Sequence, residues 1–176
     1  MKILFLDIDS VLNTPKYGED LYNDRNSDFQ FVEADVPLDV NCINALKHIF
    51  KEVPDLKVVW STDWRLYNEP TFNSFKNPLI WLEAQDWMKD RVISKTPKLT
   101  MPSSHFEEIH AWLSKNTNID VETFAILEDF VDLNGLAEFF KRYYRNKIFK
   151  CEYGSGLTIE IAEKVVKHLK GQSNGF

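Results

Sequence analysis

Cysteine is scarce in this sequence, and that scarcity argues against a disulfide framework or a cysteine-rich metal site. The 176 residues contain two cysteines, Cys42 and Cys151, which lie far apart in the chain. Their positions lack the spacing of metal ligands. We therefore expect both thiols to be reduced core residues in a reducing compartment, rather than partners in a disulfide.

Long apolar runs and clustered basic residues are also missing. The N-terminal apolar stretch is too short for a signal peptide, and no segment is long enough to span a membrane. Twenty-seven acidic residues against 21 basic ones give a net charge of −6, which argues against an extended groove that captures nucleic acid. A local basic pocket remains compatible with this balance. We expect a soluble, cytoplasmic protein with no membrane partner.

The most informative segment is the apolar run 3–6, which leads into two carboxylates, Asp7 and Asp9. A buried strand that ends in Asp-x-Asp directs both acids from the carboxyl edge of a sheet, where open α/β folds bind their ligands. Two carboxylates held so close repel each other unless a cation lies between them. The pattern therefore predicts a divalent metal, or one acid as nucleophile and the other as proton carrier. The simpler alternative is a strand followed by an acidic turn.

The rest of the chain alternates between strand and helix patterns, which predicts a single α/β domain with a parallel sheet. Residues 14–36 are polar and aromatic without periodicity, and we expect a loop or small flap there. We assign residues 1–170 to the domain and 171–176 to a frayed tail. Strands are expected at 56–60, 91–94, 123–127 and 147–151, and helices at 39–53, at 77–88, from 104 and from 158.

Polar residues follow two further strands of this predicted sheet. Ser61 and Thr62 come after strand 56–60, and Glu128 with Asp129 comes after strand 123–127. Because parallel strands share one carboxyl edge, we expect these side chains to meet the N-terminal pair of carboxylates.

In this order the residues resemble the motifs of the haloacid dehalogenase (HAD)-like phosphatase superfamily. Asp7-x-Asp9 is similar to its nucleophile motif, Ser61 to its second motif, and Glu128-Asp129 with Asp132 to its fourth. More narrowly, four segments resemble the small capless branch found alone and in RNA-repair proteins. They are residues 60–65, 106–113, 126–129 and 156–158. The resemblance implies a HAD-like, Rossmann-like three-layer sandwich of about five mostly parallel strands, without a large cap domain.

The resemblance also implies a role for each matching residue. Asp7 would be the nucleophile that forms an aspartyl-phosphate, and Asp9 would protonate the leaving alcohol and then activate water. Ser61 would donate a hydrogen bond to a phosphate oxygen, with Thr62 as the alternate. Mg²⁺ would bind Asp7, the main-chain carbonyl of Asp9, and Asp129.

Three positions depart from the family pattern. Ser10 stands where the family usually has glycine, and Glu128 precedes Asp129 where an aspartate is common. The third motif requires a cation, because the nucleophile and the phosphate repel each other. We choose Lys98 for it, with His105 and Lys95 as the alternatives.

The resemblance implies a Mg²⁺-dependent phosphomonoester hydrolase. Without a cap the site is expected to be open, which suits an end phosphate on a bulky substrate such as a nucleotide or a nucleic-acid terminus. We therefore expect a phosphorylated small molecule or a nucleic-acid end as the substrate. The competing hypothesis is a catalytically degenerate HAD-fold module that binds a partner or regulates one. Trp64 and Arg65 have two interpretations, as structural residues or as phosphate contacts.

Overall fold

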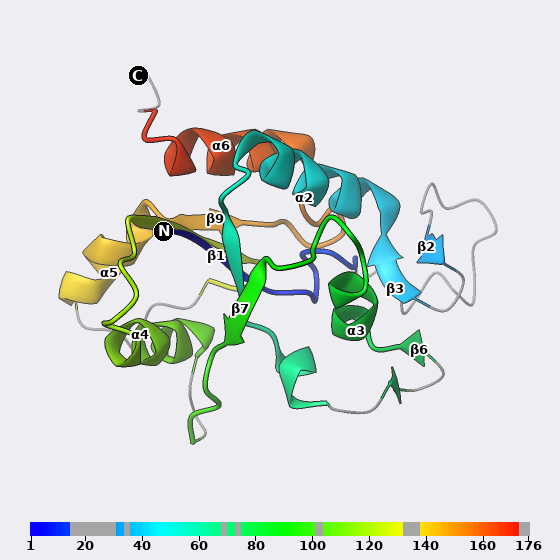
Figure 1. Ribbon diagram of the computed structural model, residues 1–176, viewed down its shortest axis with the longest axis horizontal. Helices are drawn as coiled ribbons and strands as arrows, with labels where there is room; N and C mark the ends of the chain where they lie inside the picture. Colours follow the sequence, from blue (N-terminus) through cyan, green and yellow to red (C-terminus); the bar gives the residue numbers. More distant parts are fainter. Residues whose placement is uncertain are drawn as a thin grey trace.

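The computed structural model describes residues 1–14, 31–33, 36–67, 70–72, 75–100, 104–131 and 138–172. The strands of its main sheet are β1 (Lys2–Leu6), β4 (Lys57–Trp60), β7 (Val92–Lys95), β8 (Thr123–Glu128) and β9 (Ile148–Lys150). The helices are α2 (Val40–Glu52), α3 (Pro78–Glu83), α4 (His105–Lys115), α5 (Glu138–Arg145) and α6 (Ile159–Leu169), and a 3₁₀ turn, η1, covers Asp63–Leu66. The five strands pair in parallel in the order β7-β4-β1-β8-β9, and helices flank the sheet (Figure 1). The predicted α/β sandwich is confirmed.

Capping side chains explain where four of the helices begin. In each, the side chain before the first helical residue accepts a hydrogen bond from a backbone N–H of the first turn, an interaction that contributes about 1 kcal/mol. The start of α4 is a capping box, in which Ser104 and Glu107 satisfy each other's backbone N–H groups. The four caps are Asp39, Asn77, Ser104 and Thr158.

The central strand β1 packs its alternate side chains against opposite helix layers. Leu4 and Leu6 face α2 and α6, whereas Ile3 and Phe5 face α4 and α5. All four are fully buried. Burial on both faces explains why this strand is a continuous apolar run rather than an alternating one.

Some elements differ from the sequence-based prediction. Helix α3 ends at Glu83, short of the predicted Met88, and the chain continues in turns toward Asp90, whose φ is +61°. Helix α5 was not predicted. Two small antiparallel pairs were not predicted either: β2 (Phe31–Glu33) with β3 (Val36–Asp39), and β5 (Thr71–Phe72) with β6 (Phe75–Lys76).

The predicted flap at 14–36 lies mostly outside the described residues, as do residues 173–176 of the predicted tail. In the part of the chain that is described, no additional group of helices and strands forms a cap domain. None of the described helices is long and apolar enough to cross a membrane.

Candidate active site

The carboxyl ends of β1, β4 and β8 lie side by side, as predicted. The backbone N–H of Asp7 donates to the carbonyl of Leu127 (3.2 Å), and that of Ser61 donates to the carbonyl of Leu6 (2.9 Å). These two bonds extend the strand pairing by one residue on each side of β1. They bring Asp7, Ser61 and the end of β8 to one edge of the sheet.

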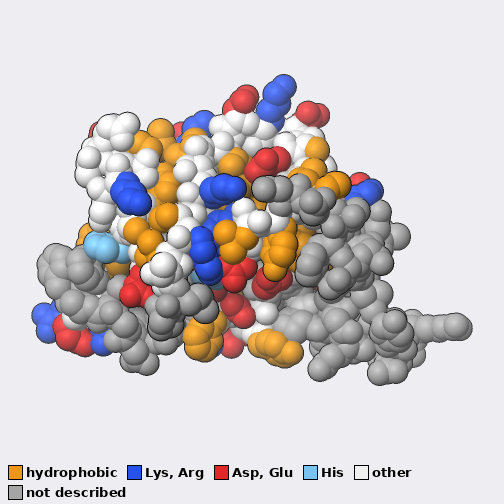
Figure 2. All heavy atoms as spheres, turned by 90° about the horizontal axis from the view of Figure 1, so that it is seen from below, with side chains coloured by type: hydrophobic (Ala, Val, Ile, Leu, Met, Phe, Trp, Pro, Cys, Tyr) orange, Lys and Arg blue, Asp and Glu red, His pale blue; other side chains and the backbone are white. Residues whose placement is uncertain are grey.

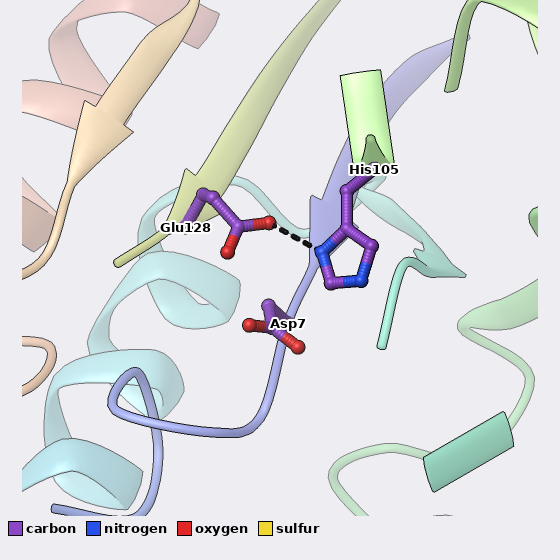
Figure 3. A group of neighbouring side chains, drawn as sticks. All are labelled: Asp7, His105 and Glu128. Carbon is purple, nitrogen blue, oxygen red and sulfur yellow. Dashed lines mark hydrogen bonds and ion pairs between the residues drawn. The ribbon is translucent and has the colours of Figure 1, made fainter. Parts of the chain in front are cut away.

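Asp7, His105 and Glu128 point toward one another at this edge (Figure 3). Each offers one possible ligand atom, and these atoms lie within 4.8 Å of one another. Asp7 and Glu128 are buried, with 3% and 2% of their surface exposed. His105 is the first residue of α4, and its Nδ1 lies 2.8 Å from Oε2 of Glu128. Three separate elements therefore build one compact cluster.

Burial dominates the electrostatics of this cluster. It raises the pKa of Asp7 well above its usual range; the charge of Glu128 adds to the rise, and His105 opposes it. Burial likewise raises the pKa of Glu128 to about 8, and the neighbouring Asp129 adds to that rise. Both carboxyls therefore retain protons more strongly than exposed acids do.

The donor set of the cluster fits a divalent cation. Carboxylate oxygens, as on Asp7 and Glu128, are the ligands that Mg²⁺ prefers, whereas an imidazole nitrogen is a softer donor. His105 already uses Nδ1 in its contact with Glu128. A cation between the carboxylates would also offset the desolvation and repulsion that raise their pKa values.

Asp9 is exposed, and two side chains contact the same oxygen of its carboxylate. Nδ2 of Asn13 donates to Oδ1 of Asp9 (2.8 Å), and Nε1 of Trp64 donates to the same atom (3.0 Å). Ser10, at the position where glycine was expected, has φ = +58°, in the left-handed region. The turn therefore requires the backbone conformation of a glycine and tolerates a serine.

Ser61 and Thr62 are both buried but differ in what their hydroxyl groups contact. Oγ1 of Thr62 accepts a hydrogen bond from the N–H of Trp64 (3.4 Å) and so caps η1. Among the described residues, Oγ of Ser61 is the one buried side-chain N or O atom without a hydrogen-bond partner. A buried hydroxyl without a partner destabilises the folded protein unless a ligand or water accepts its hydrogen bond.

The three basic candidates for the third motif lie in different surroundings. Nζ of Lys98 is 3.1 Å from a carboxylate oxygen of Asp63 and 3.7 Å from one of Glu108. Lys95 donates to the backbone carbonyl of Arg65 (3.1 Å). His105 lies in the cluster with Asp7, and its charge lowers the pKa of that carboxyl. On the face drawn in Figure 2, acidic side chains gather near the centre, and basic ones lie beside them.

The structure supports the structural interpretation of Arg65. Its guanidinium is buried, pairs with the buried carboxylate of Glu108, and donates through Nε to the carbonyl of Thr96 (3.0 Å). These contacts connect η1 to α4 and to the chain after β7. Arg65 therefore has carboxylate and carbonyl partners in place of a phosphate.

The sequence-based prediction gave Glu128 and His105 only secondary places, and the structure places both beside Asp7. For Glu128, the alternation of side chains along β8 carried a signal. Phe124 and Ile126 face the α4 layer, so Glu128, two residues further on, is expected on the same face. Asp129 was chosen as the metal ligand and lies outside the three-residue cluster. Asp132 lies outside the described residues. The metal role of Asp129 stays a prediction.

Comparison with known proteins identifies the family of this fold and site. Searches of curated proteins and of solved structures gave no significant match. The sequence model of the HAD domain in Swiss Army Knife RNA repair proteins matches residues 3–162, which is most of the chain. The protein therefore belongs to the family of HAD domains found in Swiss Army Knife RNA repair proteins.

Proposed function

We propose that this protein is a Mg²⁺-dependent phosphomonoester hydrolase that works through an aspartyl-phosphate. The observation that carries the proposal is the buried hydroxyl of Ser61, which has no hydrogen-bond partner among the described residues. Ser61 directly follows β4 and lies beside Asp7, because its N–H donates to the carbonyl of Leu6, the residue before Asp7. A phosphate oxygen bound at Asp7 would satisfy this hydroxyl. Family membership supports the same chemistry.

In the first step, a carboxylate oxygen of Asp7 attacks phosphorus and forms the new P–O bond. The P–O bond to the leaving alcohol breaks, and Asp9 gives its proton to the departing oxygen. Such a general acid contributes about 10²–10⁴-fold to the rate. The exposure of Asp9 supports this role, because the leaving group must reach it from solvent.

In the second step, Asp9 takes a proton from water as that water attacks the phosphorus of the aspartyl-phosphate. The P–O bond to Asp7 breaks, inorganic phosphate leaves, and both side chains regain their starting state. Ser61 donates its hydrogen bond to a phosphate oxygen in both steps.

Bound Mg²⁺ would neutralise charge on the phosphoryl group and on the carboxylates. We propose Asp7, the main-chain carbonyl of Asp9, and Asp129 as the residues that hold it. Glu128 is the additional candidate, because its carboxyl lies beside Asp7. For the third-motif cation, the geometry favours His105. Lys98 ranks second, because its ammonium group already pairs with the carboxylates of Asp63 and Glu108.

We propose the end phosphate of a nucleic acid, or a nucleotide, as the substrate. The family occurs in RNA repair proteins, and no cap domain covers the edge of the sheet among the described elements. A screen of phosphorylated metabolites beside 5′- and 3′-phosphorylated oligonucleotides tests this choice. Faster turnover of metabolites than of oligonucleotides would contradict a nucleic-acid end.

Hydrolysis of p-nitrophenyl phosphate tests the reaction itself. We expect turnover with Mg²⁺, loss of turnover with EDTA, and a loss of roughly tenfold or more in Ser61→Ala. Ser155→Ala is the matched control, because this serine is exposed and its hydroxyl contacts only a backbone carbonyl in the same turn. Absence of hydrolysis in wild type with Mg²⁺, across the whole substrate screen, would favour the degenerate module instead.

A further inference from the structure

Asp9 combines exposure to solvent with a fixed orientation. Two hydrogen bonds reach its carboxylate, from Asn13 (2.8 Å) and Trp64 (3.0 Å), and both end on the same atom, Oδ1. Within the described residues, no donor contacts the other oxygen, Oδ2. An exposed aspartate on a turn would ordinarily rotate freely, so this arrangement restricts the carboxylate to one orientation.

Both donors are themselves held in place. Oδ1 of Asn13 accepts from the N–H of Ser10 (2.8 Å), so this amide connects the two ends of the turn after Asp9. The amide orientation follows from these two contacts, because Oδ1 must accept and Nδ2 must donate.

Trp64 is fixed by the short segment to which it belongs. Its backbone N–H donates to Oγ1 of Thr62, and the next residue, Arg65, forms an ion pair with the buried carboxylate of Glu108. The Trp64 ring also contacts Tyr67 edge-on, with centroids 6.0 Å apart. The indole N–H therefore contacts Asp9 from η1, a fixed turn that follows β4, whereas Asp9 itself follows β1.

We propose that Trp64 is a positioning residue for Asp9, an inference that rests on the proposed function. The hydrogen bonds from Asn13 and Trp64 hold Oδ1, so Oδ2 is the oxygen available to the leaving alcohol. The indole thus directs Oδ2 toward the leaving alcohol. Trp64 itself transfers no proton and acts only through Asp9.

The substitution Trp64→Phe removes the indole N–H and keeps an aromatic ring. The test measures kcat/KM, which covers the steps up to departure of the alcohol, for two substrates. The alcohol leaving group of an alkyl phosphate needs a proton to depart. The p-nitrophenolate released from p-nitrophenyl phosphate departs without one. We expect Trp64→Phe to lower kcat/KM about tenfold to hundredfold for the alkyl phosphate and only a few-fold for p-nitrophenyl phosphate.

The double variant Asp9→Asn/Trp64→Phe separates positioning from a general structural role. If Trp64 acts through Asp9, the double variant matches Asp9→Asn alone on the alkyl phosphate. Trp81→Phe is the matched control, because its indole N–H also donates to a carboxylate, Oε1 of Glu33 (2.8 Å), on the exposed surface. We expect this control to keep wild-type kcat/KM on both substrates.

Two results would overturn the inference while leaving the proposed function intact. One is equal loss on both substrates in Trp64→Phe. The other is a further loss when Trp64→Phe is added to Asp9→Asn. A wild-type protein that hydrolyses none of the screened substrates with Mg²⁺ would instead refute the proposed function, and the positioning role with it.

Discussion

Replacing Glu128 by glutamine should remove much of the pH dependence of stability in metal-free buffer. Burial raises the pKa of Glu128 from 4.5 to about 8 in the folded protein. Between these values the folded protein keeps a proton that the unfolded chain has released. The contribution of Glu128 to stability is therefore fully present below about pH 4.5 and is lost as the pH rises through about 8.

The size of this loss follows from the two pKa values. The gap between 4.5 and about 8 corresponds to an upper bound on the order of 5 kcal/mol in the free energy of unfolding. Glutamine has a similar shape and does not titrate, so the variant should lose less stability over the same range. Part of the slope should remain, because burial also raises the pKa of Asp7.

Urea denaturation in EDTA at several pH values between about 5 and 8 measures this effect. Glu52→Gln is a suitable control, because Glu52 is only partly buried, pairs with Lys170 (2.7 Å) and has a lowered pKa. That control should leave the slope over this range unchanged. Equal slopes in wild type and Glu128→Gln would refute the conclusion that the buried carboxyl retains its proton.

Three further outcomes are expected. Gly156→Ala should destabilise the protein by about 1–3 kcal/mol in urea denaturation, because its Cβ would come within 2.7 Å of a thiol sulfur and 2.8 Å of a backbone carbonyl oxygen. Gly154→Ala, with nothing within 4 Å of the new Cβ, should lose less; equal losses would contradict the steric explanation. Mg²⁺ should raise the Tm, because at a hundredfold excess over Kd it adds about 2.7 kcal/mol to the free energy of unfolding. The rise should be larger at higher pH, because the site carboxyls must lose protons to bind the ion. Asp129→Ala should reduce that rise, and a wild-type Tm indifferent to Mg²⁺ would contradict metal binding. His105→Gln should lower kcat/KM by roughly 10²-fold or more, and Lys98→Met by less; the opposite order in the kinetic assay would assign the third motif to Lys98.

The parts of the fold that could be predicted were those encoded locally. Asp39, Asn77, Ser104 and Thr158 were each predicted to start a helix, and each caps one. A cap is a contact between residues two or three positions apart, so its signal is contained in a short window of sequence. The continuous apolar strands were equally visible, because both of their faces are buried.

The parts that could not be predicted depend on contacts between distant segments. His105 and Glu128 are 23 positions apart and meet only because α4 packs on the face of the sheet toward which the end of β8 points. The early end of α3 at Glu83 and the small strand pairs of two to four residues are likewise set by tertiary packing. Composition and periodicity carry little information about such pairings.

The aspartyl-phosphate on Asp7 can be measured directly. Turnover is stopped with acid within one catalytic cycle, and peptides from the protein are analysed by mass spectrometry. We predict one phosphorylated peptide, with the phosphate on Asp7, which accumulates further in Asp9→Asn because water activation is slowed. The phosphate should be absent from Asp7→Asn, which should also have lost turnover. Hydrolysis that continues in Asp7→Asn at the wild-type rate would contradict the covalent mechanism.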